Sequence, residues 1–235
     1  MRRTNRLLFA GTLVAPIFMG LTLVGAIASP GFSLERHQVS LLLTGPVGWL
    51  QVTNFIVTGL LGMALALGLR RSLSPGRGAV WAPISVGAYG VFLIIAGLFH
   101  PDPQLGFPAG APSGVPTPPS AASNLHAMAF SLLALSIVVG GFVMARRFAA
   151  RNERGWMTYS IANSMLIVVL VVAGSVLVTS GYAGLPLFAV ALCISSWVSV
   201  ISLHSARARP VDEAESSDRP DAAHVNRTFN QRAQR

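Results

Sequence analysis

Hydrophobic residues gather in six long runs that contain no Asp, Glu, Lys or Arg. The runs span residues 7–29, 48–69, 80–99, 125–144, 159–179 and 185–203. Each is close to the length of about 20 apolar residues that a helix needs to cross a membrane. A helix satisfies its backbone hydrogen bonds internally, as a hydrocarbon surrounding requires. The pattern predicts an all-α polytopic membrane protein, a bundle of six transmembrane helices.

The charged residues between these runs indicate how the bundle is oriented. All 17 basic residues are arginine, and the net charge is +9. They lie before the first run (Arg2, Arg3, Arg6), between the second and third (Arg70, Arg71, Arg77), between the fourth and fifth (Arg146, Arg147, Arg151, Arg154) and after the sixth. Only Arg36 falls on the opposite side. Cytoplasmic loops are enriched in basic residues, so we expect both termini in the cytoplasm and no role in binding nucleic acid.

The two ends of the chain are polar. Residues 1–6 form a short basic segment, and residues 204–235 are poor in large apolar side chains and hold five of the eight acidic residues. Such a composition cannot bury enough apolar surface to fold. We expect a basic cytoplasmic N-terminus, a transmembrane domain over residues 7–203 and a disordered cytoplasmic tail over residues 204–235.

The first run has a second interpretation. Arg2 and Arg3 precede it, and Ala26-Ile27-Ala28 near its end has the small-x-small form of a signal-peptidase site. The run is long for a signal peptide and contains Pro16, so a spanning helix is the preferred interpretation. Proline frees one backbone carbonyl and kinks a helix, which a membrane tolerates when neighbouring groups compensate.

The connections on the side of Arg36 differ from each other. Residues 30–47 contain Glu35, Arg36 and His37 followed by Val39 and three leucines, a pattern that predicts a short helix lying on the outer leaflet. Residues 100–124 hold seven prolines and predict an irregular loop.

Several short motifs resemble a known family. They are Ala10-Gly11 through Ala15-Pro16, Pro30-Gly31-Phe32, Val39-Ser40-Leu41, Gly48-Trp49-Leu50, Phe55 to Gly59, Gly97-Leu98-Phe99 with Asp102-Pro103, and Leu125-His126. The chain thereby resembles the DUF998 family of uncharacterised bacterial six-helix integral membrane proteins. The resemblance implies a multi-pass protein of the bacterial cell membrane and supplies no activity and no cofactor.

Polar residues collect at one level of the expected bundle, on its outer side. They are His100, Asp102, His126, Gln51, Asn54, Glu35, Arg36 and His37. Polar side chains at that depth usually face a bundle interior or a wet cavity. We expect an outward-facing polar cavity, and one hypothesis is that Asp102 and His126 form a buried, coupled pair in it. The alternative is that His100 and His126 are interfacial residues hydrogen-bonded to loop carbonyls, and that Asp102 caps the first turn of its loop. His100, Asp102 and His126 are also the candidates for a metal, since Zn²⁺ takes His and carboxylate ligands, although their spacing matches no established ligand pattern.

Three functions remain open at this point. The first and preferred one is a membrane protein whose cavity binds a lipid headgroup or a small-molecule ligand. The second is a membrane-embedded hydrolase or lipid-modifying enzyme that uses an outer His/Asp site. The third is a small transporter or an accessory subunit. The sequence holds no phosphate-binding loop and no Ser/His/Asp motif that would decide among them.

Overall fold

The computed structural model describes residues 2–207, which contain helices and loops and no β-strand. In chain order the elements are α1 (Arg2–Ala10), η1 (Gly11–Leu13), α2 (Val14–Ile27), η2 (Val39–Thr44), α3 (Gly48–Ser72), α4 (Trp81–Leu98), α5 (Ala121–Ala150), α6 (Arg154–Leu177) and α7 (Gly184–Arg207), where η marks a 3₁₀ helix. Six helices are long and apolar enough to cross a membrane, the first being the combined Thr4–Ile27 segment. The all-α fold with six membrane-span helices is confirmed.

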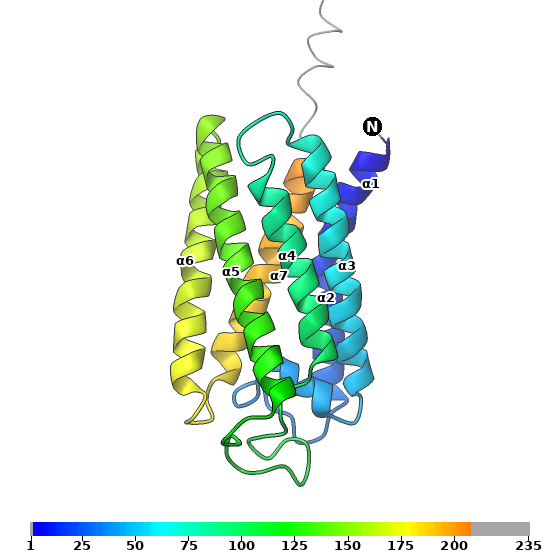
Figure 1. Cartoon of the computed structure of the whole chain (residues 1–235), viewed down its shortest axis with the longest axis vertical. Coiled ribbons are helices and arrows are strands. Elements are labelled where there is room, and N and C mark those ends of the chain that lie inside the picture. Colours follow the sequence, from blue (N-terminus) through cyan, green and yellow to red (C-terminus); the bar gives the residue numbers. More distant parts are fainter. Residues whose placement is uncertain (1, 208–235) are drawn as a thin grey trace, which may run out of the picture.

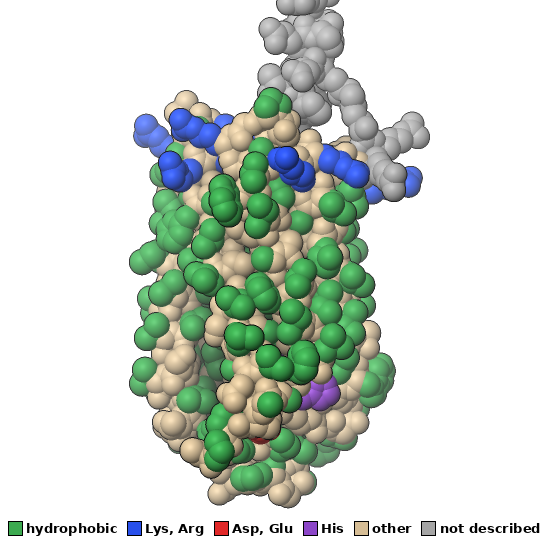
Figure 2. All heavy atoms as spheres, viewed as in Figure 1, with side chains coloured by type: hydrophobic (Ala, Val, Ile, Leu, Met, Phe, Trp, Pro, Cys, Tyr) green, Lys and Arg blue, Asp and Glu red, His purple; other side chains and the backbone are tan. Residues whose placement is uncertain are grey.

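The helices stand side by side in a bundle (Figure 1). Each packs against the next in sequence, and α7 also packs on α1 and α2, which closes the bundle. The loops 28–47, 99–120 and 178–183 lie together at one end, which we call the loop end. The opposite end, the arginine end, carries a band of basic side chains (Figure 2). The core between the helices includes Tyr89 of α4 and Trp197 of α7, both fully buried.

Helices α3 and α4 pack closely, because both carry glycine where they cross. A Cβ atom added at Gly90 would stand 2.5 Å from the carbonyl oxygen of Gly59. Small residues at helix interfaces allow such backbone approach in membranes. This crossing fixes the distance between two of the helices that surround the cavity described below.

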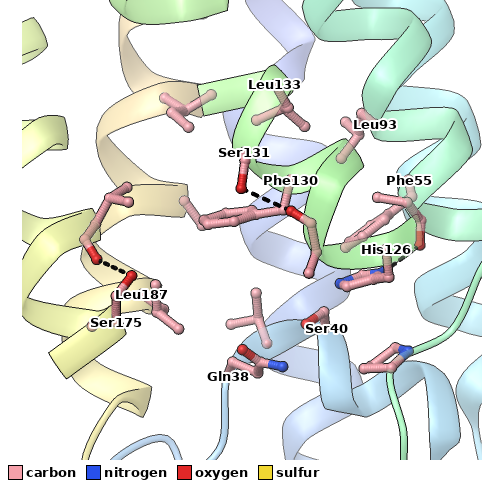
Figure 3. Close-up of a pocket in the computed structure, with 18 of the residues that line it drawn as sticks. Gln38, Ser40, Phe55, Leu93, His126, Phe130, Ser131, Leu133, Ser175 and Leu187 are labelled. Atoms are coloured by element: carbon pink, nitrogen blue, oxygen red, sulfur yellow. Dashed lines mark hydrogen bonds between the residues drawn. The ribbon is translucent and has the colours of Figure 1, made fainter. Parts of the chain in front are cut away.

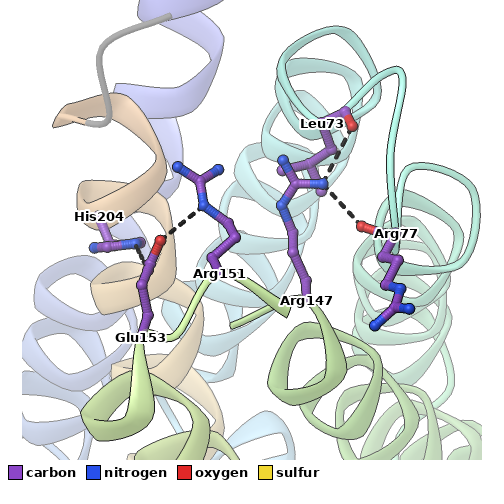
Figure 4. A network of polar contacts seen from close by, with 6 residues as sticks. All are labelled: Leu73, Arg77, Arg147, Arg151, Glu153 and His204. Carbon is purple, nitrogen blue, oxygen red and sulfur yellow. Dashed lines mark hydrogen bonds and ion pairs between the residues drawn. The ribbon is translucent and has the colours of Figure 1, made fainter. Parts of the chain in front are cut away.

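At the arginine end, polar contacts hold the connections in place (Figure 4). The Arg147 guanidinium of α5 donates hydrogen bonds to the carbonyls of Leu73 (3.2 Å) and Arg77 (2.8 Å) in the α3–α4 connection. Glu153, just before α6, accepts from Arg151 at 2.8 Å and contacts the His204 ring of α7 at 3.0 Å. These residues therefore fasten the connections to α5 and α7 besides carrying charge.

Two sequence-based expectations change at the ends. A short helix does form at Val39–Thr44, but it is a 3₁₀ helix, and Leu41, Leu42 and Leu43 are buried in the bundle. The expectation of a helix on the outer leaflet is therefore wrong, because the leucines fill the loop end. Residues 204–207 continue α7, and the rest of the expected tail, from residue 208 on, lies outside the described residues.

Candidate functional site

A cavity of about 330 Å³ opens inside the loop-end half of the bundle. Its walls come from α4, α5, α6 and α7. Phe18 of α2 and Phe55 of α3 also line it, and Gln38 to Ser40 line it at the loop end. Volumes of about 300–1,000 Å³ are typical of sites for small molecules. The cavity is therefore large enough for a ligand, and it lies among the membrane-span helices.

The deeper wall of the cavity is apolar. It is formed by Phe130 and Leu133 of α5, Val171 of α6 and Ile194 of α7. The residues that line the cavity include no Asp, Glu, Lys or Arg. Burying a charge without a partner is costly, so this wall favours an uncharged, apolar group.

His126 provides the main polar group of the cavity. Its Nδ1 lies 2.9 Å from the carbonyl oxygen of Ala96 and 2.8 Å from that of Phe99. These carbonyls belong to the last turn and the C-cap of α4, where helical partners run out. Since carbonyls only accept, Nδ1 carries the proton, and in the neutral ring Nε2 is an acceptor.

The Nε2 atom of His126 points into the cavity. In Figure 3 one side of the ring is hydrogen-bonded toward α4, and the other side faces the open space near Ser40 and Gln38. Within residues 2–207, no side chain or backbone group donates a hydrogen bond to Nε2, although the residue is only 6 % exposed. Nε2 is therefore an unpaired acceptor that is open to the cavity.

Three serines of the cavity are already engaged. Ser131, Ser175 and Ser195 each donate to a carbonyl one turn earlier in their own helix, at 2.9, 2.8 and 2.7 Å. Such back-bonding satisfies a hydroxyl within its helix. The hydrogens of these three hydroxyls are therefore not free to donate to a ligand, and this part of the wall remains weakly polar.

The cavity opens sideways between α5 and α6. Ala127 and Ser131 of α5 and Ser175 of α6 line it and are also exposed. In the lower half of Figure 2 the surface is hollowed between these two helices. Ser131 lies ten residues into α5, about 15 Å from its start at a rise of about 1.5 Å per residue. Ser175, by contrast, lies two residues before the end of α6. The mouth therefore runs from near the loop end along the side of the bundle, between α5 and α6.

Gln51 and Asn54 do not line this cavity. They form a buried network between α2 and α3, in which the Asn54 amide donates to the Phe18 carbonyl (3.0 Å) and the Thr22 hydroxyl (3.2 Å). Gln51 donates to the same hydroxyl at 3.3 Å, and Thr58 donates to Asn54. Their hydrogen-bonding capacity is used to join helices, which is the packing role of polar residues in membranes.

His37 joins two loops. Its Nδ1 accepts from the Ser33 N–H at 3.0 Å, and its Nε2 lies 3.2 Å from the Leu105 carbonyl, to which it donates. Burial lowers the pKa of His37, the Leu105 bond opposes this, and the positive charge of Arg36 lowers it further. Glu35 and Arg36 themselves are exposed. Of these three, only His37 is enclosed, and it is engaged in structure.

Asp102 and His126 have different partners. One oxygen of Asp102 accepts the Ser120 backbone N–H at 2.7 Å, at the start of α5, where helix dipoles favour a negative charge. Hydrogen bonds from the Ser120 side chain and backbone lower the pKa of Asp102. Asp102 is half-buried and His100 exposed. The expected Asp102–His126 hydrogen bond is not found among the described residues.

The candidate metal ligands are not brought together either. Within residues 2–207, no group of three or more His, Cys, Asp or Glu side chains lies close enough together to hold a metal ion. His126 already uses Nδ1 on two carbonyls, and Asp102 is held at the start of α5. His100, Asp102 and His126 thus do not form a ligand set in this structure.

Sequence reasoning identified His126 and missed the rest of the cavity. Gln38 and Ser40 precede or begin a short 3₁₀ helix, and the aromatic residues Phe18, Phe55 and Phe130 read as ordinary parts of apolar runs. No local signal separates a cavity-lining residue from one that packs or faces lipid. Only the packing of six helices brings these side chains together.

Comparison with known proteins supports the resemblance found in the sequence. The model of the family described as "Protein of unknown function (DUF998)" matches residues 12–204. No curated protein and no solved structure matches the chain. The match reaches all six membrane-span helices and covers well over half of the chain. The chain therefore belongs to the DUF998 family, and with its six apolar helices it is a multi-pass membrane protein.

Proposed function

We propose that this protein binds an uncharged, largely apolar small molecule or lipid in the cavity between α4, α5, α6 and α7. The single observation that carries the proposal is the lateral mouth at Ala127, Ser131 and Ser175, which joins a cavity of about 330 Å³ to the lipid-facing surface. A ligand dissolved in the membrane reaches such a site without entering water.

The composition of the walls favours a ligand with an apolar tail. Leu133, Val171 and Ile194 form the deep end, whereas His126, Gln38 and Ser40 lie toward the loop end. Burying apolar surface contributes roughly 25 cal/mol per Å². The polar groups at one end then orient the molecule, with its polar part near the loop end and its tail toward the middle of the membrane.

In this proposal the loop end faces the outside of the cell, and both termini lie in the cytoplasm. The placement of the arginines at the opposite end supports this orientation. The ligand is therefore taken from the outer leaflet of the cell membrane.

A blocked mouth tests the proposal. Ser175→Trp places a large side chain at the mouth, whereas Val176→Trp, one residue later and 70 % exposed, points about 100° away around the helix. The full-length protein is purified in a mild detergent and challenged with a photoreactive, uncharged long-chain probe. We expect labelling of α5 and α6 in the wild type and the Val176→Trp variant and its loss in the Ser175→Trp variant. Equal labelling of both variants would contradict the proposal.

A further inference from the structure

The unpaired Nε2 atom of His126 indicates which polar group the ligand carries. We infer that the cavity recognises a hydroxyl group, which donates a hydrogen bond to His126 Nε2, at the end of a single apolar chain. This rests on the proposed function and adds the class of ligand: an uncharged long-chain alcohol or a lipid with a free hydroxyl.

The His126 ring fixes the direction of the hydrogen bond. Nδ1 is committed as a donor to the Ala96 and Phe99 carbonyls at 2.9 and 2.8 Å, so Nε2 of the neutral ring accepts. Among the described residues Nε2 has no hydrogen-bond partner, and it is open to the cavity rather than fully buried. A ligand hydroxyl supplies that partner, whereas an ether or carbonyl oxygen, which only accepts, does not.

The residues around the cavity exclude a charged group at the polar end of the ligand. The lining contains no Arg or Lys to pair with a phosphate or carboxylate, and no Asp or Glu to pair with an amine. Ser131 and Ser175 donate to their own helices. A charged group in this place would be buried without compensation, and so the donor is neutral.

The size of the cavity limits the apolar part. At about 330 Å³ the cavity lies at the small end of the range of about 300–1,000 Å³ for ligand sites. This size favours a single chain, with its far end leaving through the mouth between α5 and α6.

The ring has a second role that any test must separate from ligand binding. By holding the Ala96 and Phe99 carbonyls, His126 fixes the end of α4 to α5. A variant at this position loses that bond as well. The comparison of two ligands on the unaltered protein is therefore the primary measurement, and the variant is the secondary one.

The experiment uses competition against the photoreactive probe on the full-length wild-type protein. The competitors are 1-dodecanol and 1-methoxydodecane, which share the chain and the oxygen but differ in the donated hydrogen. We expect the alcohol to compete about three- to tenfold better, the range of one neutral hydrogen bond. In a folded His126→Phe variant the two should compete equally.

The outcomes separate the two claims. Equal competition by the alcohol and the ether on the wild type overturns the hydroxyl inference and leaves the cavity as a binding site. Unchanged preference for the alcohol in the His126→Phe variant also overturns it, because another group would then be the acceptor. Failure of the probe to label the wild type at all overturns the proposed function together with the inference.

Discussion

The hydroxyl of Ser199 on α7 replaces a missing backbone hydrogen bond next to Ala15 at the start of α2. It accepts the Ala15 N–H at 2.8 Å and donates to the Gly11 carbonyl at 3.3 Å, the partner that Ala15 would have in a regular helix. Pro16 follows immediately, and a proline ring disturbs the turn before it. A side chain inserted into the ladder is a recognised cause of such a break. The structure thus supplies the neighbouring compensation expected from the sequence.

Ser199→Ala tests this bridge. Removing the hydroxyl leaves the Ala15 N–H without its partner, whereas the Gly11 carbonyl still accepts the Val14 N–H. We expect a loss of about 1–3 kcal/mol in the free energy of unfolding. Ser196→Ala is the matched control, since Ser196 lies one turn earlier on α7 and makes no hydrogen bond described for its side chain. Denaturant unfolding in detergent micelles measures both. An equal effect of the two substitutions would mean that the bridge contributes nothing.

A methyl group at Gly90 should destabilise the crossing of α3 and α4. Its Cβ would lie 2.5 Å from the Gly59 carbonyl oxygen, so the helices must move apart. Overpacking of this kind costs about 1–3 kcal/mol. At Gly87, on the same helix, a Cβ would meet Ala66 at an ordinary 3.5 Å, so Gly87→Ala should be neutral or stabilising. Melting temperatures of the two variants in detergent provide the comparison, and a more stable Gly90→Ala variant would refute the close crossing.

The membrane-span helices could be predicted from the sequence because their signal is local. Each run lacks charges over a membrane-spanning length, and helix ends follow within a few residues. The cavity could not be predicted, because Phe130, Val171 and Leu187 have the same character as residues that face lipid. The partner of Asp102, the Ser120 N–H, could not be predicted either, because it depends on how the irregular, proline-rich loop between the two residues folds.

The orientation proposed above predicts the outcome of reporter fusions. The arginines gather at one end of the bundle. A reporter that works only in the cytoplasm should therefore be active when inserted after Arg71 or Arg154. A reporter that works only outside the cell should be active within the 108–119 segment of the α4–α5 loop. A cytoplasmic reading for that loop would reverse the orientation, and with it the leaflet from which the ligand enters.

Acid should loosen the contact between the loops 28–47 and 99–120 through His37. The folded state lowers the pKa of His37 below 6.5, mainly by burial, so the unfolded chain binds the proton more readily. Stability contributed by the neutral ring is therefore complete above about pH 6.5 and is lost as the pH falls below it. Protonation also ends the acceptance of the Ser33 N–H by Nδ1.

Melting temperatures between pH 8 and pH 5 measure this loss. We expect the melting temperature of the wild type to fall over this interval and that of His37→Asn to start lower and fall less. His100→Asn is the control, because His100 is exposed in the neighbouring loop. If His37→Asn keeps the pH dependence of the wild type, another group is responsible for it.

Asp102 and His126 should behave as independent residues. Asp102 holds the Ser120 N–H at the start of α5, and His126 holds the carbonyls at the end of α4, so they share no hydrogen-bond partner. We expect Asp102→Ala to cost about 0.3–1 kcal/mol, as for a charge at a helix N-terminus. His126→Ala should cost more, because the buried Ala96 carbonyl and the partly buried Phe99 carbonyl lose their donor.

In a double-mutant cycle the two costs should then add within about 0.5 kcal/mol. The contribution of Asp102 should also vanish in acid. Since its folded-state pKa lies below the ordinary value of 3.8, its stabilisation is present above that pH and lost as the pH falls. Unfolding free energies of the single and double variants at neutral pH measure the coupling. A coupling well above 0.5 kcal/mol would restore the joint Asp–His site, and with it the case for chemistry between the loop ends of α4 and α5.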